Sequence, residues 1–318
     1  MYAPSLVCPE LLSGQALTHT FVLQPGRLCV GVAVALQSCP RLFLYPVSTK
    51  NASILQPEMA SRVMRDLHAQ QAPLFAIAQE LEALAMEVLP KLEPPITDNM
   101  RLIAAVLFGR ILTSFQSVYV LTERGLCGDA RTLVRALAES AIVLGALVQD
   151  PSTVTDQLVA RHIINERKLL SAWLDDPQAV AIMSPEQLQS FKARLAENRA
   201  KHAHIKVDPV DVQKLARSAN LLWLYNSAFR YHSSDAAHTS ALALERHVKV
   251  NEAAEITALQ FGPNAEEVPN TLSNAVVPML SAMHTATEVF GLKEYHARLD
   301  KIQAHWKALT GSAEQTAP

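Results

Sequence analysis

Apolar residues recur at spacings of three, four and seven over most of the chain after residue 59, which is the pattern of amphipathic helices. The pattern predicts helices over residues 61–88, 98–121, 129–149, 153–174, 184–204, 212–231, 272–290 and 295–309. Weak alternation near 251–266 indicates a short hairpin or an irregular loop. We therefore predict an all-α fold, an antiparallel bundle of about seven or eight helices with short connections.

The helix predicted at 129–149 is expected to be the centre of this bundle. Asp129 follows a glycine and suits the N-cap position, and Pro151 stops the segment shortly after its end. From Ala136 onward nearly every position is apolar, so almost no face of the helix is left for water. Such a helix is typically buried by its neighbours on all sides.

Three charged residues interrupt this apolar helix. Arg131, Arg135 and Glu139 recur at every fourth position and therefore lie along one face, with two of the three expected to point into the protein. One interpretation is a structural ion pair between Arg135 and Glu139, because buried charges persist when they are paired. The other is a functional pocket in which Arg135 anchors an anion and Glu139 acts as a base or orients another group.

A second polar stretch, YHSSDAAHTS at 231–240, ends the helix that carries Tyr225 in its inward row. If the helix continues, Ser234 and His238 share a face, so the two stretches together could supply a catalytic pair, Glu139 with His238, and ligand-binding groups at Tyr225 and Ser234. The alternative is that the hydroxyls cap helix ends and His238 is a half-buried structural histidine. The histidine spacing in the stretch does not match a zinc-binding helix, so no metal site is predicted.

His162 is expected to join the same polar centre. It lies on the helix predicted at 153–174, on a face that it shares with apolar residues. The polar centre predicted from the sequence therefore consists of Arg135, Glu139, His162 and His238.

Composition narrows the class of protein. The chain has 318 residues, 49% of them hydrophobic and 18% charged, with a formal net charge of −2, which describes a globular protein rather than a general nucleic-acid binder. No uninterrupted apolar run indicates a membrane span, and the four cysteines show no metal-ligand spacing, so we expect a cytoplasmic protein. The glycine-rich nucleotide-binding motifs and the common hydrolase motifs are missing, and no cofactor is expected.

The first 58 residues differ from the rest. They contain five charged residues, six of the eighteen prolines and three of the four cysteines, and they show no helical period. We expect a poorly ordered extension, or translation that begins at Met59. The predicted organisation is thus an extension over 1–58, a single helical domain over 59–309 and a disordered tail over 310–318.

Residues 59–292 resemble a broad family of uncharacterised prokaryotic helical proteins, a domain of unknown function. The resemblance rests on two short motifs, Arg135-Ala-Leu-Ala-Glu139 after a glycine turn and Ser234-Asp-Ala-Ala-His238 at the end of a tyrosine-bearing helix. It implies an all-helical architecture and no settled activity.

Three functions remain open from the sequence. The first is a binding or regulatory protein whose polar centre takes a small anion. The second is a metal-independent ribonuclease resembling the HEPN family, helical bundles that dimerise and act on RNA with an arginine and a histidine; Arg230 with His238, or Arg199 with His204, would stand in those positions. The third is a metal-dependent hydrolase that uses Glu139, His162, Glu166 and His238. The expected partners are a small anionic ligand or RNA and a second copy of the chain, and no membrane.

Overall fold

The fold is taken from a computed structural model, which describes residues 54–205, 210–235, 240–251, 256–259 and 262–311. Its elements, in chain order, are α2 (Pro57–Gln70), α3 (Ala72–Val88), η2 (Leu89–Lys91), α4 (Asn99–Thr122), α5 (Cys127–Gln149), α6 (Pro151–Asp175), α7 (Pro177–Ile182), α8 (Pro185–Lys201), α9 (Val212–Ser218), α10 (Leu222–Leu224), η3 (Tyr225–Arg230), α11 (Tyr231–Asp235), α12 (Ala241–Glu245), β1 (Val248–Val250), β2 (Ile256–Leu259), α13 (Val268–Val289), η4 (Lys293–Tyr295) and α14 (His296–Gly311).

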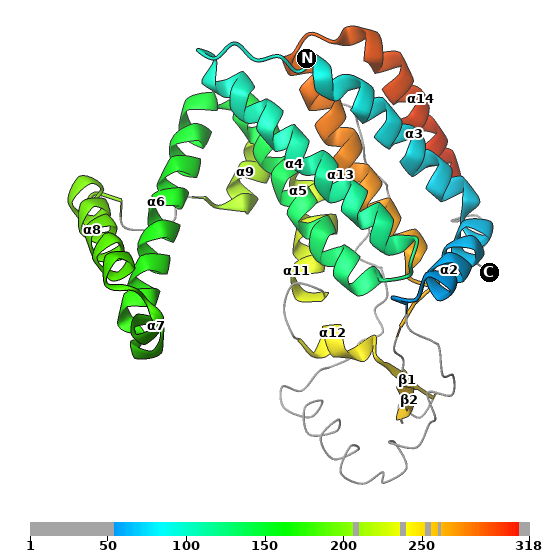
Figure 1. The fold of residues 1–318 in the computed structure, drawn as a ribbon. Coiled ribbons are helices and arrows are strands. Elements are labelled where there is room, and N and C mark those ends of the chain that lie inside the picture. Colours follow the sequence, from blue (N-terminus) through cyan, green and yellow to red (C-terminus); the bar gives the residue numbers. More distant parts are fainter. Residues whose placement is uncertain (1–53, 206–209, 236–239, 252–255, 260–261, 312–318) are drawn as a thin grey trace.

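The body of the protein is built on three long helices, α4, α5 and α13, that pack on one another (Figure 1). α3 and α14 cover the other side of α13. Leu137, Ile142, Leu144 and Leu147 on α5 are all completely buried. The predicted all-α fold and the central position of the helix at 129–149 are therefore confirmed.

α6, α7 and α8 form an arm that projects from the C-terminal end of α5 (Figure 1). Arg167 on α6 holds the arm together: its guanidinium donates to the Asn198 side chain at 3.0 Å and to the carbonyl oxygens of His202 and Ile205 at 2.9 Å each. Asn198 is buried although most of α8 is exposed.

Local signals placed several helix ends correctly. Asp98 caps α4 by accepting from the Arg101 backbone N–H, and Ser184 with Gln187 forms the capping box that opens α8. β1 and β2 form a short antiparallel hairpin in which Val248 lies opposite Leu259, at the position expected for a hairpin or loop.

Three boundaries differ from the prediction. The helix expected at 61–88 is divided at Gln71 into α2 and α3, because Pro73 stands in the first turn of a new helix. The helix expected at 212–231 breaks after α9, where Asn220 has a φ of 57°, and continues through a π-helical turn at η3. α5 begins at Cys127 with Leu126 as its N-cap, so Asp129 lies in the first turn and is not the cap.

The expectations for the two ends of the chain fall largely on residues outside the described part, 1–53 and 312–318. α2 begins at Pro57, within the predicted extension. Within the described residues two helices, α4 and α5, are long and apolar enough to cross a membrane by length and composition alone, a test that core helices of soluble proteins also pass. The expected absence of a membrane segment stays a prediction.

Candidate functional site

Arg135 and Glu139 do not pair with each other. Glu139 accepts a hydrogen bond at 3.0 Å from Arg161 on α6, and Arg161 also donates to the Val210 carbonyl oxygen at 3.1 Å. Arg135 donates through Nε to the Ser233 hydroxyl at 2.8 Å. The predicted i, i+4 pair is therefore wrong: such a pair gains only about 0.3 kcal/mol, and each side chain finds a better partner on a neighbouring element.

Arg135 belongs to an aromatic and polar column along η3 and α11. Its guanidinium lies 4.6 Å from the centre of the Phe229 ring, a cation–π arrangement, and Tyr225 stacks on Phe229 with 5.3 Å between the ring centres. Tyr225 and Arg135 therefore both pack against the Phe229 ring. The side chain of Ser234 and the whole of His238 lie outside the described part of the chain, so their predicted roles stay predictions.

His162 is exposed on α6, and no described hydrogen bond joins it to Arg135 or Glu139. On the same helix the Glu166 carboxylate accepts from Arg194 and Asn198, which lower its pKa. Among the described residues no group of three His, Cys, Asp and Glu side chains is arranged to hold a metal ion. Glu139 accepts a hydrogen bond from Arg161, and Glu166 accepts one from Arg194, so the two carboxylates belong to separate ion pairs. This arrangement does not support the hypothesis of a metal-dependent hydrolase.

The HEPN-like pairs gain no support either. Arg199 donates to the Ser171 hydroxyl at 3.2 Å on the arm, and His204 is exposed beyond the end of α8. The other pair includes His238, outside the described residues.

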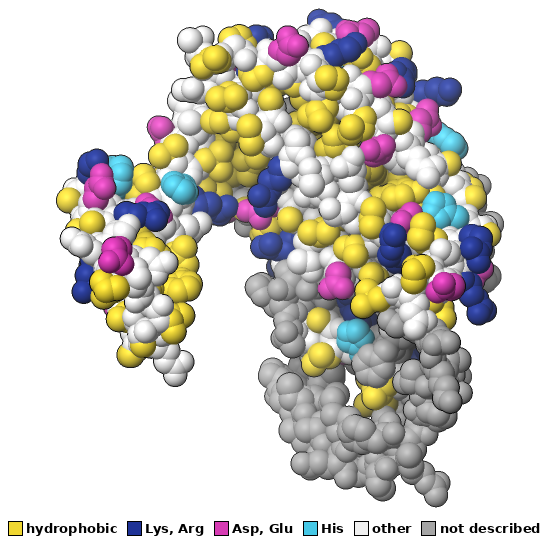
Figure 2. Space-filling model, viewed as in Figure 1, with side chains coloured by type: hydrophobic (Ala, Val, Ile, Leu, Met, Phe, Trp, Pro, Cys, Tyr) yellow, Lys and Arg dark blue, Asp and Glu magenta, His cyan; other side chains and the backbone are white. Residues whose placement is uncertain are grey.

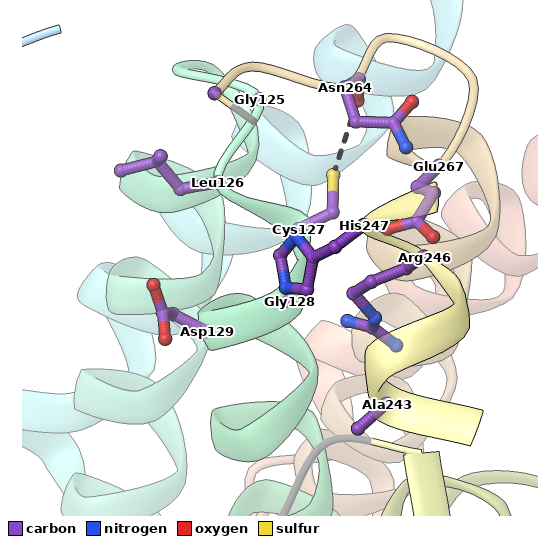
Figure 3. Close-up of a pocket in the computed structure, with 11 residues that line it drawn as sticks. Gly125, Leu126, Cys127, Gly128, Asp129, Ala243, Arg246, His247, Asn264 and Glu267 are labelled. Atoms are coloured by element: carbon purple, nitrogen blue, oxygen red, sulfur yellow. Dashed lines mark hydrogen bonds between the residues drawn. The ribbon is translucent and has the colours of Figure 1, made fainter. Parts of the chain in front are cut away.

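A pocket of about 290 Å³ opens at the start of α5 (Figure 3). It is bounded by the turn that leads into α5, by the end of α12 and by the loop before α13. Its lining residues are Gly125, Leu126, Cys127, Gly128, Asp129, Ala243, Arg246, His247, Gly262, Asn264 and Glu267. The sequence did not predict this pocket, because no motif spacing joins the three segments that line it.

The loop before α13 is held directly against the turn that leads into α5. The Asn264 backbone N–H donates to the Gly125 carbonyl oxygen at 2.9 Å, and the Cys127 thiol lies 3.6 Å from the Asn264 carbonyl oxygen. Gly125 has a φ of 70°, in the left-handed region that favours glycine. This conformation lets the two segments meet and form one wall of the pocket.

The first turn of α5 brings backbone N–H donors to the edge of this pocket. The leading N–H groups of a helix have no acceptor within the helix and form the positive end of its dipole, and Leu126 provides no side-chain cap. Arg246 comes so close that a Cβ added to Gly128 would lie 2.9 Å from its Nη1. Figure 3 shows Asp129 on the opposite side of this turn from Arg246.

Glu267, which lines the pocket, forms an ion pair with the buried Arg131. Arg131, one turn along α5, has an Nη1 that lies 3.5 Å from the Glu267 carboxylate, and its Nε donates to the Thr271 hydroxyl at 3.1 Å. Its side chain is only 8% exposed. The buried Arg131 therefore offsets the charge of Glu267, while Arg246 lines the pocket itself.

Cys127 is a weak nucleophile in this setting. Burial raises the pKa of its thiol to about 11, with a smaller opposing effect from a hydrogen bond to Thr271. We expect iodoacetamide to label Cys127 very slowly at pH 8, with a rate that rises nearly tenfold per pH unit up to about pH 11, because only the thiolate reacts. Peptide mass spectrometry resolves Cys127 from the other three cysteines; rapid labelling of the folded protein at pH 8 would contradict this prediction.

No curated protein and no solved structure is similar to the chain at a significant level. A family match covers residues 101–256, from α4 to the first residue of β2, and includes the Gly125–Asp129 turn and Arg246. The match supports the expected resemblance to an uncharacterised domain family. Over residues 101–256 the chain is similar to the family described as a family of unknown function, DUF5677.

Proposed function

We propose that this protein is a binding or regulatory protein that takes a small oxyanion, a carboxylate or a phosphate, in the pocket at the start of α5. The observation that carries the proposal is the position of the Arg246 guanidinium beside the first turn of a long helix, at an open hollow. A helix N-terminus and an arginine attract the same ligand, because both present N–H donors and positive charge.

Size and charge are consistent with this ligand. The pocket volume of about 290 Å³ is close to the lower end of small-molecule sites, roughly 300 to 1,000 Å³. Two carboxylates, Asp129 and Glu267, also line the pocket, and the Glu267 carboxylate lies 3.5 Å from Arg131 Nη1, which offsets part of its charge. Arg246 lines this pocket, whereas Arg135 does not, so Arg246 is the arginine that we assign to the anion.

The protonation of the thiol argues against Cys127 as a catalytic nucleophile. A nucleophilic cysteine needs a lowered pKa, and the pKa of Cys127 is raised instead. The proposed role therefore uses the pocket to hold an anion, with Cys127 as part of the buried wall.

Arg246→Gln is expected to weaken the binding of inorganic phosphate about tenfold or more, since a hydrogen bond to a charged group contributes roughly 1.5 to 3 kcal/mol. Isothermal titration calorimetry with phosphate, and with citrate as a carboxylate probe, measures the change. Arg217→Gln is the matched control, because Arg217 is an exposed arginine on α9, which packs against the other end of α5.

Gly128→Ala separates binding from folding. The new Cβ would displace only the flexible end of Arg246, and alanine favours a helix more than glycine by about 1 kcal/mol. Weaker phosphate binding with an unchanged or higher Tm is the expected result. If the wild-type protein binds neither probe, or if Arg246→Gln binds phosphate as well as the wild type does, the proposal is wrong.

A further inference from the structure

The pocket at the start of α5 is lined by groups of both charges. Arg246 supplies a guanidinium, and Asp129 and Glu267 supply two carboxylates. The first turn of α5 adds backbone N–H groups that have no acceptor within the helix. A ligand with negative charge alone is attracted by the arginine and the N–H groups but repelled by both carboxylates. The lining therefore suits a ligand that carries both charges.

The positive and the negative group lie close to one point of the pocket. Burial is the main cause of the raised pKa of the Cys127 thiol; beside it, Glu267 raises this pKa and Arg246 lowers it. Because the interaction between charges weakens with distance, both groups lie near the same sulfur atom. In Figure 3 both side chains extend from the α12 and α13 side of the pocket toward the first turn of α5.

The Glu267 carboxylate can accept a hydrogen bond from a ligand while it pairs with Arg131. Arg131 Nη1 lies 3.5 Å from Glu267 Oε1, which is longer than a strong charged hydrogen bond, and Arg131 Nε donates to Thr271 instead. The Glu267 side chain is 20% exposed, against 8% for Arg131. Glu267 is therefore accessible from the pocket, although its arginine partner is buried.

The charge balance of the site favours a neutral ligand over a dianion. Together with Arg131, the two arginines and the two carboxylates cancel when His247 is neutral. On the visible face of the described residues, basic and acidic side chains are interspersed (Figure 2), so the surroundings favour neither sign of ligand. A zwitterion has no net charge, yet it can place each of its charges next to the opposite one in the pocket.

We propose that the ligand of this pocket is a small zwitterion with a carboxylate and a primary ammonium on one carbon atom, an α-amino acid. The inference rests on the proposed function and narrows its oxyanion to a carboxylate. The ligand carboxylate accepts from Arg246 and from the N–H groups of the first turn of α5, and the ammonium donates to Glu267. The two ligand charges are neighbours because Arg246 and Glu267 are both close to Cys127.

The test compares three ligands of one carbon skeleton, by isothermal titration calorimetry with the full chain. They are L-leucine, isocaproate, which lacks the amine, and isoamylamine, which lacks the carboxylate. This skeleton is chosen because Leu126 and Ala243 give the pocket apolar lining. Wild-type protein is expected to bind L-leucine about tenfold or more tighter than either analogue, since each analogue leaves one charged group of the pocket without its partner.

Glu267→Gln should remove the preference for L-leucine over isocaproate and should strengthen phosphate binding, because a carboxylate that repels the anion is gone. Glu266→Gln is the matched control. Glu266 is exposed and does not line the pocket, so this variant should bind every probe as the wild type does. Circular dichroism shows whether the variants are folded, and the comparison of ligands on the wild type needs no variant.

Two results would overturn the inference: equal binding of L-leucine and isocaproate by the wild type, or a preference for L-leucine that persists in folded Glu267→Gln. In both cases, phosphate or citrate binding that depends on Arg246 leaves the proposed function standing. If the wild type binds neither phosphate, citrate nor L-leucine, the proposed function and this inference are both wrong.

Discussion

Gly125→Ala is expected to lower the free energy of unfolding by about 2 to 3 kcal/mol, because it combines a strained backbone with a collision. The φ of 70° at this position is unfavourable for alanine. The added Cβ would lie 2.8 Å from the Pro263 Cβ and 2.9 Å from the Asn264 backbone nitrogen. Neither atom can move without shifting the loop before α13, so urea unfolding followed by circular dichroism should show the loss.

Gly291→Ala is the matched control for the collision. Gly291 has a φ of 71° but no atom within 4 Å of the added Cβ, so only the conformational cost of about 1 to 2 kcal/mol applies. Gly125→Ala should also weaken phosphate binding, since the Asn264 contact forms a wall of the pocket, whereas Gly291→Ala should not. Equal losses of stability in the two variants would show that the loop yields freely and would contradict the prediction.

The fold was predictable because its signals are local. Helical periodicity links residues within one or two turns of each other, and the all-α fold that it predicted is confirmed. The Asp98 cap of α4 and the Ser184 capping box of α8 are equally local. Where prediction failed, a competing local signal had been passed over: Pro73 opens a new helix, and the break at Asn220 follows from a left-handed residue that periodicity does not reveal.

The candidate site was much less predictable because its contacts are distant in sequence. Glu139 meets Arg161, 22 residues away, in preference to its helical neighbour Arg135, and Arg135 meets Ser233, 98 residues away. No spacing rule points to either contact. Arg246 is far from Gly128 in the sequence, and only the folded chain brings the two together. The sequence predicted the central helix, and its candidate residues Arg135 and Glu139 lie further along α5 than the pocket at the first turn.

Arg131 is a buried, charged residue on the central helix α5. Removing one member of a buried ion pair leaves an uncompensated charge, and the loss is typically about 3 to 5 kcal/mol. Arg131→Met should cost about 3 kcal/mol, at the lower end of that range because the Glu267 side chain is 20% exposed. The Thr271 hydroxyl also loses the hydrogen bond from the Arg131 Nε. Urea unfolding again measures the change.

A double-mutant cycle with Glu267→Gln tests whether the cost of Arg131→Met arises from the ion pair. The double variant Arg131→Met with Glu267→Gln should recover about 1 kcal/mol or more relative to the sum of the single losses, because the unpaired carboxylate is gone. Additive losses would mean that Arg131 acts through packing and its other contacts rather than through Glu267.

Phosphate binding tests whether Arg131 itself holds the anion. If Arg131→Met abolishes phosphate binding while stability is unchanged, Arg131 is the anion ligand and its pairing with Glu267 is secondary. The buried position of Arg131 beneath the pocket wall predicts the reverse, a large loss of stability with only a modest change in phosphate affinity.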